Sequence, residues 1–232
     1  FYLRKTEWSD GNPVTAKDFE NAWKQSISPS FASASAFLLS PILNAPAILR
    51  GELPVDQLGV VAIDERTLRV QLSKPVPYFL SLVSMCPFFP IPTHIERANS
   101  RWAMDPNPRQ FVSNGPFKLS IYKKNENYVF EKNPNYWDVS HIKLEKIYAY
   151  FIGDETTCLQ MFEAKEIDYL NSFFTPLSLD NLGNYKKNNK LITYPTAGTI
   201  FCSFNLKRPY LQNQKLRKAL SLGVDRSSIV SN

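Results

Sequence analysis

The sequence WSDGNPVTAKDF at residues 8–19 joins a tight turn to the start of a helix. Its first half contains Ser, Asp, Gly, Asn and Pro, the residue types that tolerate the backbone angles of turns. Thr15 is the predicted N-cap, and Asp18 three residues later makes an acidic variant of the capping box. Apolar residues follow at helical spacing and give the helix one apolar face: Phe19, Ala22, Trp23 and Ile27. The stretch therefore predicts a turn and then an amphipathic helix, which Pro29 keeps short.

Helices and strands are predicted in mixed order along the rest of the chain. Alternating apolar and polar residues predict strands at 67–72, 117–121, 128–130, 143–152 and 200–206. Helical patterns predict one or two short helices within 30–50, and others at 78–83, at 155–164 and after the N-cap Asn213. Hairpins together with crossovers indicate an α+β or mixed α/β architecture. Five prolines between Pro87 and Pro108 prevent long regular structure there, and this stretch is the predicted crossing between two lobes.

Composition favours a globular protein with no membrane-spanning segment. Of the 232 residues, 44% are apolar and 21% charged, and no apolar run approaches the ~18 residues needed to cross a bilayer. The net charge of +6 is scattered along the chain, which argues against nucleic-acid binding. The densest basic groups, Lys123-Lys124 and Lys186-Lys187 with Lys190, are predicted to be solvated turns between strands.

The sequence offers little for catalysis or metal binding. His94 and His141 are the only histidines, they are far apart, and neither belongs to a zinc-binding or catalytic motif. We therefore expect neither an enzyme nor a bound metal. Three cysteines, Cys86, Cys158 and Cys202, form no disulfide framework and are predicted to pack in the core. The chain starts at Phe1 without a methionine or a leader pattern, and we expect it to be part of a longer polypeptide.

Several short motifs follow the opening stretch in a fixed order: NGPF at 114–117, EKNPNYW at 131–137, EID at 166–168, RKAL at 217–220 and DR at 225–226. Together with WSDG and PVTAKDF, this order resembles the bacterial extracellular solute-binding proteins of family 5, the oligopeptide-binding receptors of ABC importers. Turns of Gly, Pro and Asn also have a structural explanation, with Trp8, Tyr136 and Trp137 as core anchors. The motifs thus indicate a family without marking a binding pocket.

The resemblance implies a two-lobed fold of the type II periplasmic binding protein class, incomplete in this chain. It assigns residues 1–95 to the second subdomain of the first lobe and residues 96–195 to the core of that lobe. Residues 196–232 match the hinge and the beginning of the second lobe. In proteins of this kind the two lobes close over an extended peptide and hold its main chain by strand-like hydrogen bonds.

The resemblance also implies a function and a location. We expect the chain to belong to a monomeric substrate-binding component that delivers oligopeptides to the permease subunits of an ABC importer. It would be periplasmic or attached to the cell surface, with a lipid anchor as one form of attachment, and would use no cofactor. Two alternatives stay open: the same fold could bind a nickel complex, haem or a sugar, or it could serve as an interaction protein without a transport role.

Three phenylalanines are the candidate ligand contacts. Phe31 and Phe37 lie in the stretch 30–37, which occupies the place where relatives present a tyrosine to the peptide. Phe201 lies in a stretch that matches a tyrosine-rich strand of relatives. Because phenylalanine lacks the tyrosine hydroxyl, we expect a preference for peptides with apolar side chains. Core packing is the alternative for all three, since phenylalanine is commonly buried.

Overall fold

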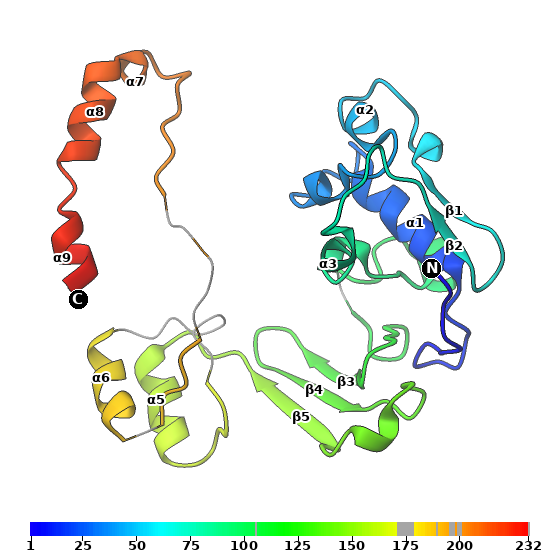
Figure 1. Ribbon diagram of the computed structural model, residues 1–232. Helices are drawn as coiled ribbons and strands as arrows, with labels where there is room; N and C mark the ends of the chain where they lie inside the picture. Colours follow the sequence, from blue (N-terminus) through cyan, green and yellow to red (C-terminus); the bar gives the residue numbers. More distant parts are fainter. Residues whose placement is uncertain (105, 171–178, 189, 195–197, 199–200, 232) are drawn as a thin grey trace. The chain divides into compact units, whose positions relative to one another are not determined.

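The computed structural model describes residues 1–104, 106–170, 179–188, 190–194, 198 and 201–231. The chain divides into two compact units, residues 1–170 and residues 171–232 (Figure 1). Each unit is described by itself. The three segments predicted from the family resemblance, 1–95, 96–195 and 196–232, concern lobes of a larger fold and remain a prediction.

A helical body forms the first part of unit 1. Its elements are α1 (Ala16–Ile27), η1 (Ala36–Leu39), α2 (Ala45–Leu49), η2 (Val55–Gln57) and the antiparallel strands β1 (Val60–Ala62) and β2 (Leu68–Val70). They are followed by α3 (Phe79–Leu82), η3 (Cys86–Phe88) and α4 (Thr93–Ala98). The predicted helix after residue 15 and the helix near 78–83 are confirmed, and the strand predicted at 67–72 forms as the shorter β2.

Helix α1 begins with the predicted capping box. The carboxylate of Asp18 accepts a hydrogen bond from the backbone N–H of Thr15 at 2.8 Å, and Thr15 also caps the N–H of the third helical residue. The buried face of α1 contains Ala22, Trp23 and Ile27. The helix ends at Ile27, two residues before Pro29, because proline cannot continue the backbone hydrogen bonding.

The core of the helical body is centred on three aromatic residues. The rings of Trp23 and Phe88 meet edge to face at 5.0 Å, and Phe79 meets Phe88 in the same way at 6.0 Å. The indole N–H of Trp23 donates to the carbonyl of Phe88 at 2.8 Å, so the buried polar atom is paired. Aliphatic side chains complete this core: Ile27, Leu39, Ile42, Ile48, Leu58, Val60 and Leu68.

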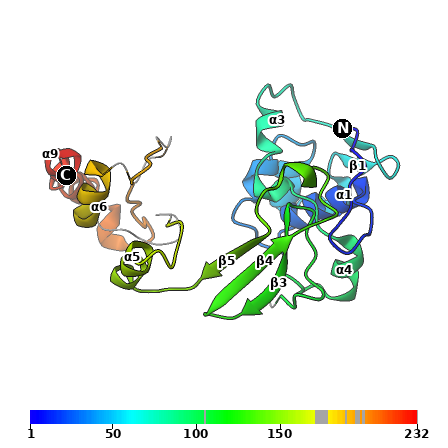
Figure 2. The ribbon, with the colours of Figure 1, turned by 90° about the horizontal axis from the view of Figure 1, so that it is seen from below.

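A three-stranded antiparallel sheet forms the next part of unit 1. Its strands are β3 (Phe117–Lys123), β4 (Asn127–Lys132) and β5 (Lys146–Tyr150), in the order β3-β4-β5 (Figure 2). Asn125 in the β3–β4 turn has φ = 60°, a conformation that asparagine tolerates, and the register shifts between Leu119 and Ile121. The strands predicted at 117–121 and 128–130 are confirmed, and they pair as an antiparallel hairpin. Helix η4 (Val139–His141) precedes β5, and α5 (Glu155–Glu163) follows it with Asp154 as N-cap.

Unit 2 contains α6 (Leu179–Lys187), α7 (Pro209–Gln212), α8 (Gln214–Leu222) and α9 (Arg226–Ser231). Asn213 caps α8 as predicted, and its side chain accepts from the backbone N–H of Lys215 at 2.9 Å. Lys186 and Lys187 occupy the last turn of α6, so the prediction that they form a turn between strands is wrong. Cations are stabilised at that end of a helix by its dipole.

Two further sequence predictions are wrong. Residues 201–206, the described part of the predicted strand 200–206, contain no strand, because alternation alone does not provide the neighbouring strand that pairing requires. Only Cys158 among the three cysteines is buried, whereas Cys86 and Cys202 are exposed. Cys86 starts η3 and lies away from the packed side that Phe88 provides.

Candidate functional site

Three of the family motifs meet at one junction inside unit 1. The turn at 8–13 binds the NGPF segment, because the backbone N–H of Ser9 donates to the carbonyl of Ser113 at 2.8 Å and the N–H of Ser113 donates to the hydroxyl of Ser9 at 3.1 Å. The EKNPNYW bend joins both: the Asn133 amide donates to the carbonyl of Gly115 at 2.9 Å, and the Asn135 amide to the carbonyl of Trp8 at 3.3 Å. Residues more than 100 positions apart are thereby held together.

Asp18 connects this junction to the helical body. Besides capping α1, its carboxylate accepts from the indole N–H of Trp8 at 3.3 Å and from the backbone N–H of Thr93 at 3.1 Å. Trp8 is only 2% exposed, and Gly11 in the same turn has φ = +88°, a conformation that glycine adopts without strain. These contacts support the structural explanation of the motifs, since their polar groups are paired within the protein.

The edge of the junction carries two exposed contacts. The imidazole of His94 on α4 pairs with the carboxylate of Asp10 at 2.7 Å. Burial raises the pKa of Asp10, but hydrogen bonds from His94 and Asn12 outweigh it and hold that pKa below its ordinary value. The guanidinium of Arg4 lies 3.7 Å from the ring centre of Trp137. Trp137 is exposed, so the prediction that it anchors the bend in the core is wrong.

The candidate ligand contacts are exposed. Phe31 is 54% exposed, Phe37 is 64% exposed, and Phe201 in unit 2 is 77% exposed, so none of the three packs in the core of the described part of its unit. Helix η1 packs through Ala36 and Leu39, which leaves Phe37 on the opposite side. Phe31 and Phe37 belong to one unit and Phe201 to the other, so unit 1 by itself assembles two of the three.

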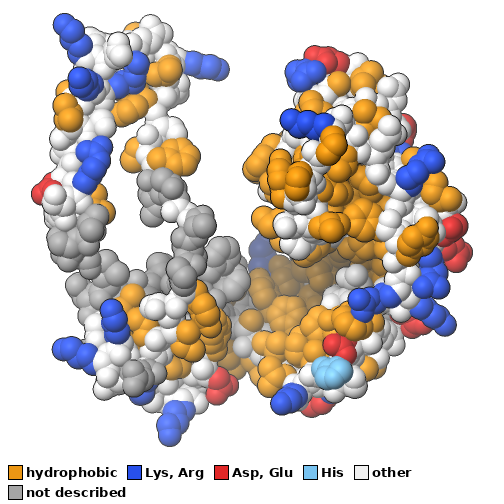
Figure 3. All heavy atoms as spheres, viewed as in Figure 1, with side chains coloured by type: hydrophobic (Ala, Val, Ile, Leu, Met, Phe, Trp, Pro, Cys, Tyr) orange, Lys and Arg blue, Asp and Glu red, His pale blue; other side chains and the backbone are white. Residues whose placement is uncertain are grey.

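Other apolar side chains are also exposed in the helical body of unit 1, which contains Phe31 and Phe37. Helix η1 packs beside η3, and α3 precedes η3. Figure 3 shows apolar side chains gathered over this part of unit 1. Along the loop after α1 and along η1, α3 and η3, the exposed large apolar residues are Phe31, Phe37, Tyr78, Leu80, Met85 and Phe89. Exposed apolar side chains that gather on a protein surface often mark a binding site.

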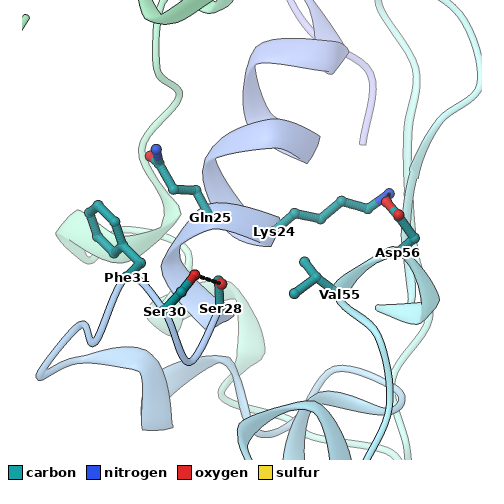
Figure 4. Close-up of a pocket in the computed structure, with 7 residues that line it drawn as sticks. All are labelled: Lys24, Gln25, Ser28, Ser30, Phe31, Val55 and Asp56. Carbon is teal, nitrogen blue, oxygen red and sulfur yellow. Dashed lines mark hydrogen bonds and ion pairs between the residues drawn. The ribbon is translucent and has the colours of Figure 1, made fainter. Parts of the chain in front are cut away.

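A hollow of about 420 Å³ lies beside Phe31 and opens to solvent. Helix α1 and its end provide Lys24, Gln25 and Ser28, the following loop provides Ser30 and Phe31, and η2 provides Val55 and Asp56. We call this hollow the Lys24 pocket. In Figure 4 the ring of Phe31 lies on one side, the pair Lys24–Asp56 lies on the other, and the two serines lie between them.

Charges are concentrated on one wall of the Lys24 pocket. The ammonium of Lys24 contacts Glu20 at 2.9 Å and Asp56 at 3.2 Å, and Glu20 also binds Lys17 at 3.0 Å. Burial lowers the pKa of Lys24, but its hydrogen bonds with Glu20 and Asp56 outweigh this and hold the pKa above 10.5. Burial raises the pKa of Glu20, and the hydrogen bonds from Lys24, Lys17 and the backbone of Ala62 bring it below 4.5. Lys24 and Glu20 are therefore charged at neutral pH.

Sequence reasoning did not identify Lys24 or Asp56. Lys24 follows Glu20 by four residues on a helix, a spacing that is normally a surface ion pair. Asp56 lies 32 residues away in sequence, and only the fold brings it to Lys24. A smaller hollow of about 270 Å³ is also lined by Gln25, whose amide donates to Glu96 of α4 at 2.8 Å.

The arrangement is suited to reversible binding. Among the described residues, no three His, Cys, Asp or Glu side chains are grouped as they would be to hold a metal ion. In the same part of the chain, no helix has both the length and the apolar character needed to cross a membrane. The open hollow is surrounded by an aromatic ring, hydroxyls, an amide and an ion pair. Such a site can bind a small ligand that has both a polar and an apolar part.

Comparison with known proteins places the chain among solute-binding proteins. The chain is 38% identical to the oligopeptide-binding protein OppA of Bacillus subtilis over 97% of its own length and 41% of that protein. The solved murein tripeptide binding protein MppA of Escherichia coli matches with a TM-score of 0.89 at 32% identity, over 100% of this chain and 45% of that one. The solved structure of Haemophilus influenzae OppA in complex with the peptide RPPGFSPFR matches with a TM-score of 0.84 at 29% identity. The match covers 100% of this chain and 45% of that one.

The chain thus spans less than half the length of these relatives. The fold expected from the sequence is confirmed: helices and strands in mixed order form part of a periplasmic binding protein fold. The family model described as bacterial extracellular solute-binding proteins, family 5 Middle, matches residues 1–232. The chain belongs to the bacterial extracellular solute-binding proteins of family 5.

Proposed function

We propose that this chain forms part of the substrate-binding component of an ABC importer that captures oligopeptides. The observation that supports this most strongly is the match along the whole chain to peptide-binding relatives, one of them solved with a nonapeptide bound. The family consists of solute-binding proteins rather than enzymes, and we propose no catalytic step for this chain.

Peptide capture would follow from hydrogen bonding and from water. Main-chain groups are the same in every peptide, so strand-like hydrogen bonds to them give affinity without selecting a sequence. Bridging waters adapt a roomy pocket to different side chains. We propose that residues 1–95 and 96–195 form one lobe around the peptide and that residues 196–232 lead through the hinge into the second lobe.

The exposed phenylalanines are the proposed ligand contacts within this segment. Phe31 and Phe37 present two rings on the surface of unit 1, and Phe201 presents a third on unit 2. Rings that are not needed for packing are free to contact a ligand. Because none of them carries a hydroxyl, we propose that peptides with apolar side chains bind more tightly than polar peptides of equal length.

We further propose that the protein acts as a monomer outside the cytoplasmic membrane, in the periplasm or attached to the cell surface. This follows the extracellular character of the family. Its partners would be the permease subunits of the importer, which recognise the closed form. We propose no nucleic-acid partner.

A thermal-shift experiment tests the proposal. The probes are mixed tripeptides to nonapeptides, nickel and haem, applied to this chain and to a chimera in which it replaces the aligned part of Bacillus subtilis OppA. A ligand at 100 times its Kd stabilises a protein by about 2.7 kcal/mol. We expect peptides to raise the melting temperature of the chimera, more for apolar than for polar peptides. Stabilisation by nickel or haem alone would show that the ligand class is wrong.

A further inference from the structure

The Lys24 pocket contains one strong and one replaceable ion pair. The side chain of Glu20 is only 7% exposed, and its oxygens bind Lys17, Lys24 and the backbone N–H of Ala62, so it is fixed in place. The side chain of Asp56 is 93% exposed and contacts Lys24 at 3.2 Å. Exposed ion pairs contribute little to stability, so the contact with Asp56 can be exchanged for another anion at small cost.

The charge balance favours an incoming anion. Lys17 and Lys24 carry two positive charges, and Glu20 carries one negative charge. Without Asp56 this group has one unbalanced positive charge beside the hollow. A carboxylate that replaces Asp56 at the ammonium of Lys24 restores neutrality, and hydrogen bonds between oppositely charged groups are among the stronger ones.

The rest of the pocket favours an apolar group next to that carboxylate. Phe31 faces the charged wall across the hollow, and Val55 lies beside Asp56 (Figure 4). The hydroxyls of Ser28 and Ser30 bond to each other at 2.8 Å between the two walls. A hollow of about 420 Å³ falls within the size range of small-molecule sites and has room for the end of a peptide.

We propose that the Lys24 pocket binds the carboxyl-terminal residue of an apolar peptide, whose carboxylate displaces Asp56 from Lys24 and whose side chain lies against Phe31 and Val55. This inference rests on the proposed function, because the carboxylate belongs to a bound peptide. The opposite possibility is a cationic group bound by Asp56 over the ring of Phe31. The two possibilities predict opposite effects when Asp56 is removed.

NMR titration of the isotope-labelled chain tests the proposal. The probes are the tripeptide Ala-Ala-Phe and the same tripeptide with an amidated carboxyl terminus. We expect the backbone signals of Lys24, Ser28, Phe31 and Val55 to shift on addition of the acid, and the amide to bind about tenfold more weakly because it cannot replace Asp56 as an anion. Equal affinity for the two peptides, or no shift of these signals, would overturn the proposal.

Three variants sharpen the titration. Asp56→Ala removes the competing carboxylate and should tighten binding of the acid about threefold, whereas weaker binding would assign the pocket to a cation. Lys24→Met should abolish binding. Lys74→Met is the matched control, because Lys74 does not line the pocket and is not part of the charge group of Lys17, Glu20 and Lys24, and it should bind as the unchanged chain does. If Lys24→Met fails to fold, Asp56→Ala decides the question alone.

The two experiments distinguish failure of the pocket proposal from failure of the proposed function. The thermal-shift experiment responds to a peptide bound anywhere in the chimera, whereas the titration reports on the Lys24 pocket. Peptides that stabilise the chimera while the pocket signals stay unchanged would overturn the pocket and leave the importer function standing. Peptides that stabilise nothing would overturn the function itself.

Discussion

The junction around Trp8 and the surface around Phe31 and Phe37 belong to the same unit but are built in opposite ways. At the junction, Trp8 is buried and its indole N–H is paired with Asp18. At the surface, both phenylalanine rings are exposed and one of them borders an open hollow. The motifs that meet at the junction are therefore structural, whereas Phe31 and Phe37 lie in a stretch of small residues without a distinctive motif.

The largest effect on stability is expected from a substitution at the junction, compared with a matched substitution at the surface. Trp8→Ala should lower the free energy of unfolding by about 3 to 5 kcal/mol, because it leaves a cavity and removes the partner of Asp18. Phe37→Ala, the matched aromatic change at the surface, should cost far less. Chemical denaturation followed by circular dichroism measures both. A similar loss of unfolding free energy in the two variants would contradict the view that Trp8 is structural and Phe37 is not.

Removal of the carboxylate that connects the junction to α1 is the next test. Asp18→Ala should cost about 2 to 3 kcal/mol, because it removes the helix cap and leaves the N–H groups of Trp8 and Thr93 without their acceptor. Thr15→Ala, which leaves the Asp18 carboxylate in place, serves as the control and should cost less. Denaturant midpoints decide between them, and an Asp18→Ala variant as stable as the original would exclude Asp18 as the connection.

Acid should weaken the ion-pair wall of the Lys24 pocket. The pKa of Glu20 is lowered in the folded protein, so its contribution to stability is complete above 4.5 and is lost as the pH falls below that value. The stability difference between the chain and Glu20→Gln should therefore shrink between pH 6 and pH 3, by about 1 kcal/mol or less after screening by solvent. Thermal melts across this range measure it. A difference that grows on acidification would have the wrong sign.

The smallest effects on stability are expected at the exposed rings. Phe31→Ala and Phe37→Ala should each change the free energy of unfolding by no more than about 0.5 kcal/mol. In the chimera, the same changes should weaken binding of apolar peptides, since each removes a ring from the proposed site. Isothermal titration measures that loss. Unchanged affinity in both variants would remove these two residues from the ligand site.

Local structure could be predicted from the sequence because it depends on neighbours a few residues apart. The capping box of Thr15 and Asp18 and the N-cap Asn213 each need contacts within three or four positions. The apolar face of α1 follows from helical spacing in the same way. The order of short motifs was likewise enough to assign the family.

The candidate site could be predicted only in part. Phe31, Phe37 and Phe201 were identified through the resemblance, but the sequence could not say whether they were buried. Periodicity shows which face of an element is apolar, and it does not show what covers that face. The same reason explains why Cys86 and Trp137 were wrongly predicted to lie in the core.

The sequence by itself determined the start and end of α1, the caps of α1 and α8, and the family. Only the tertiary structure decided that three motifs meet at one junction, that Phe31 and Phe37 face outward, and that Asp56 reaches Lys24. Contacts across tens of residues depend on how loops close and on which surfaces pack together. The long-range contacts are therefore a property of the whole folded unit, because each of them forms only when all the intervening elements are in place.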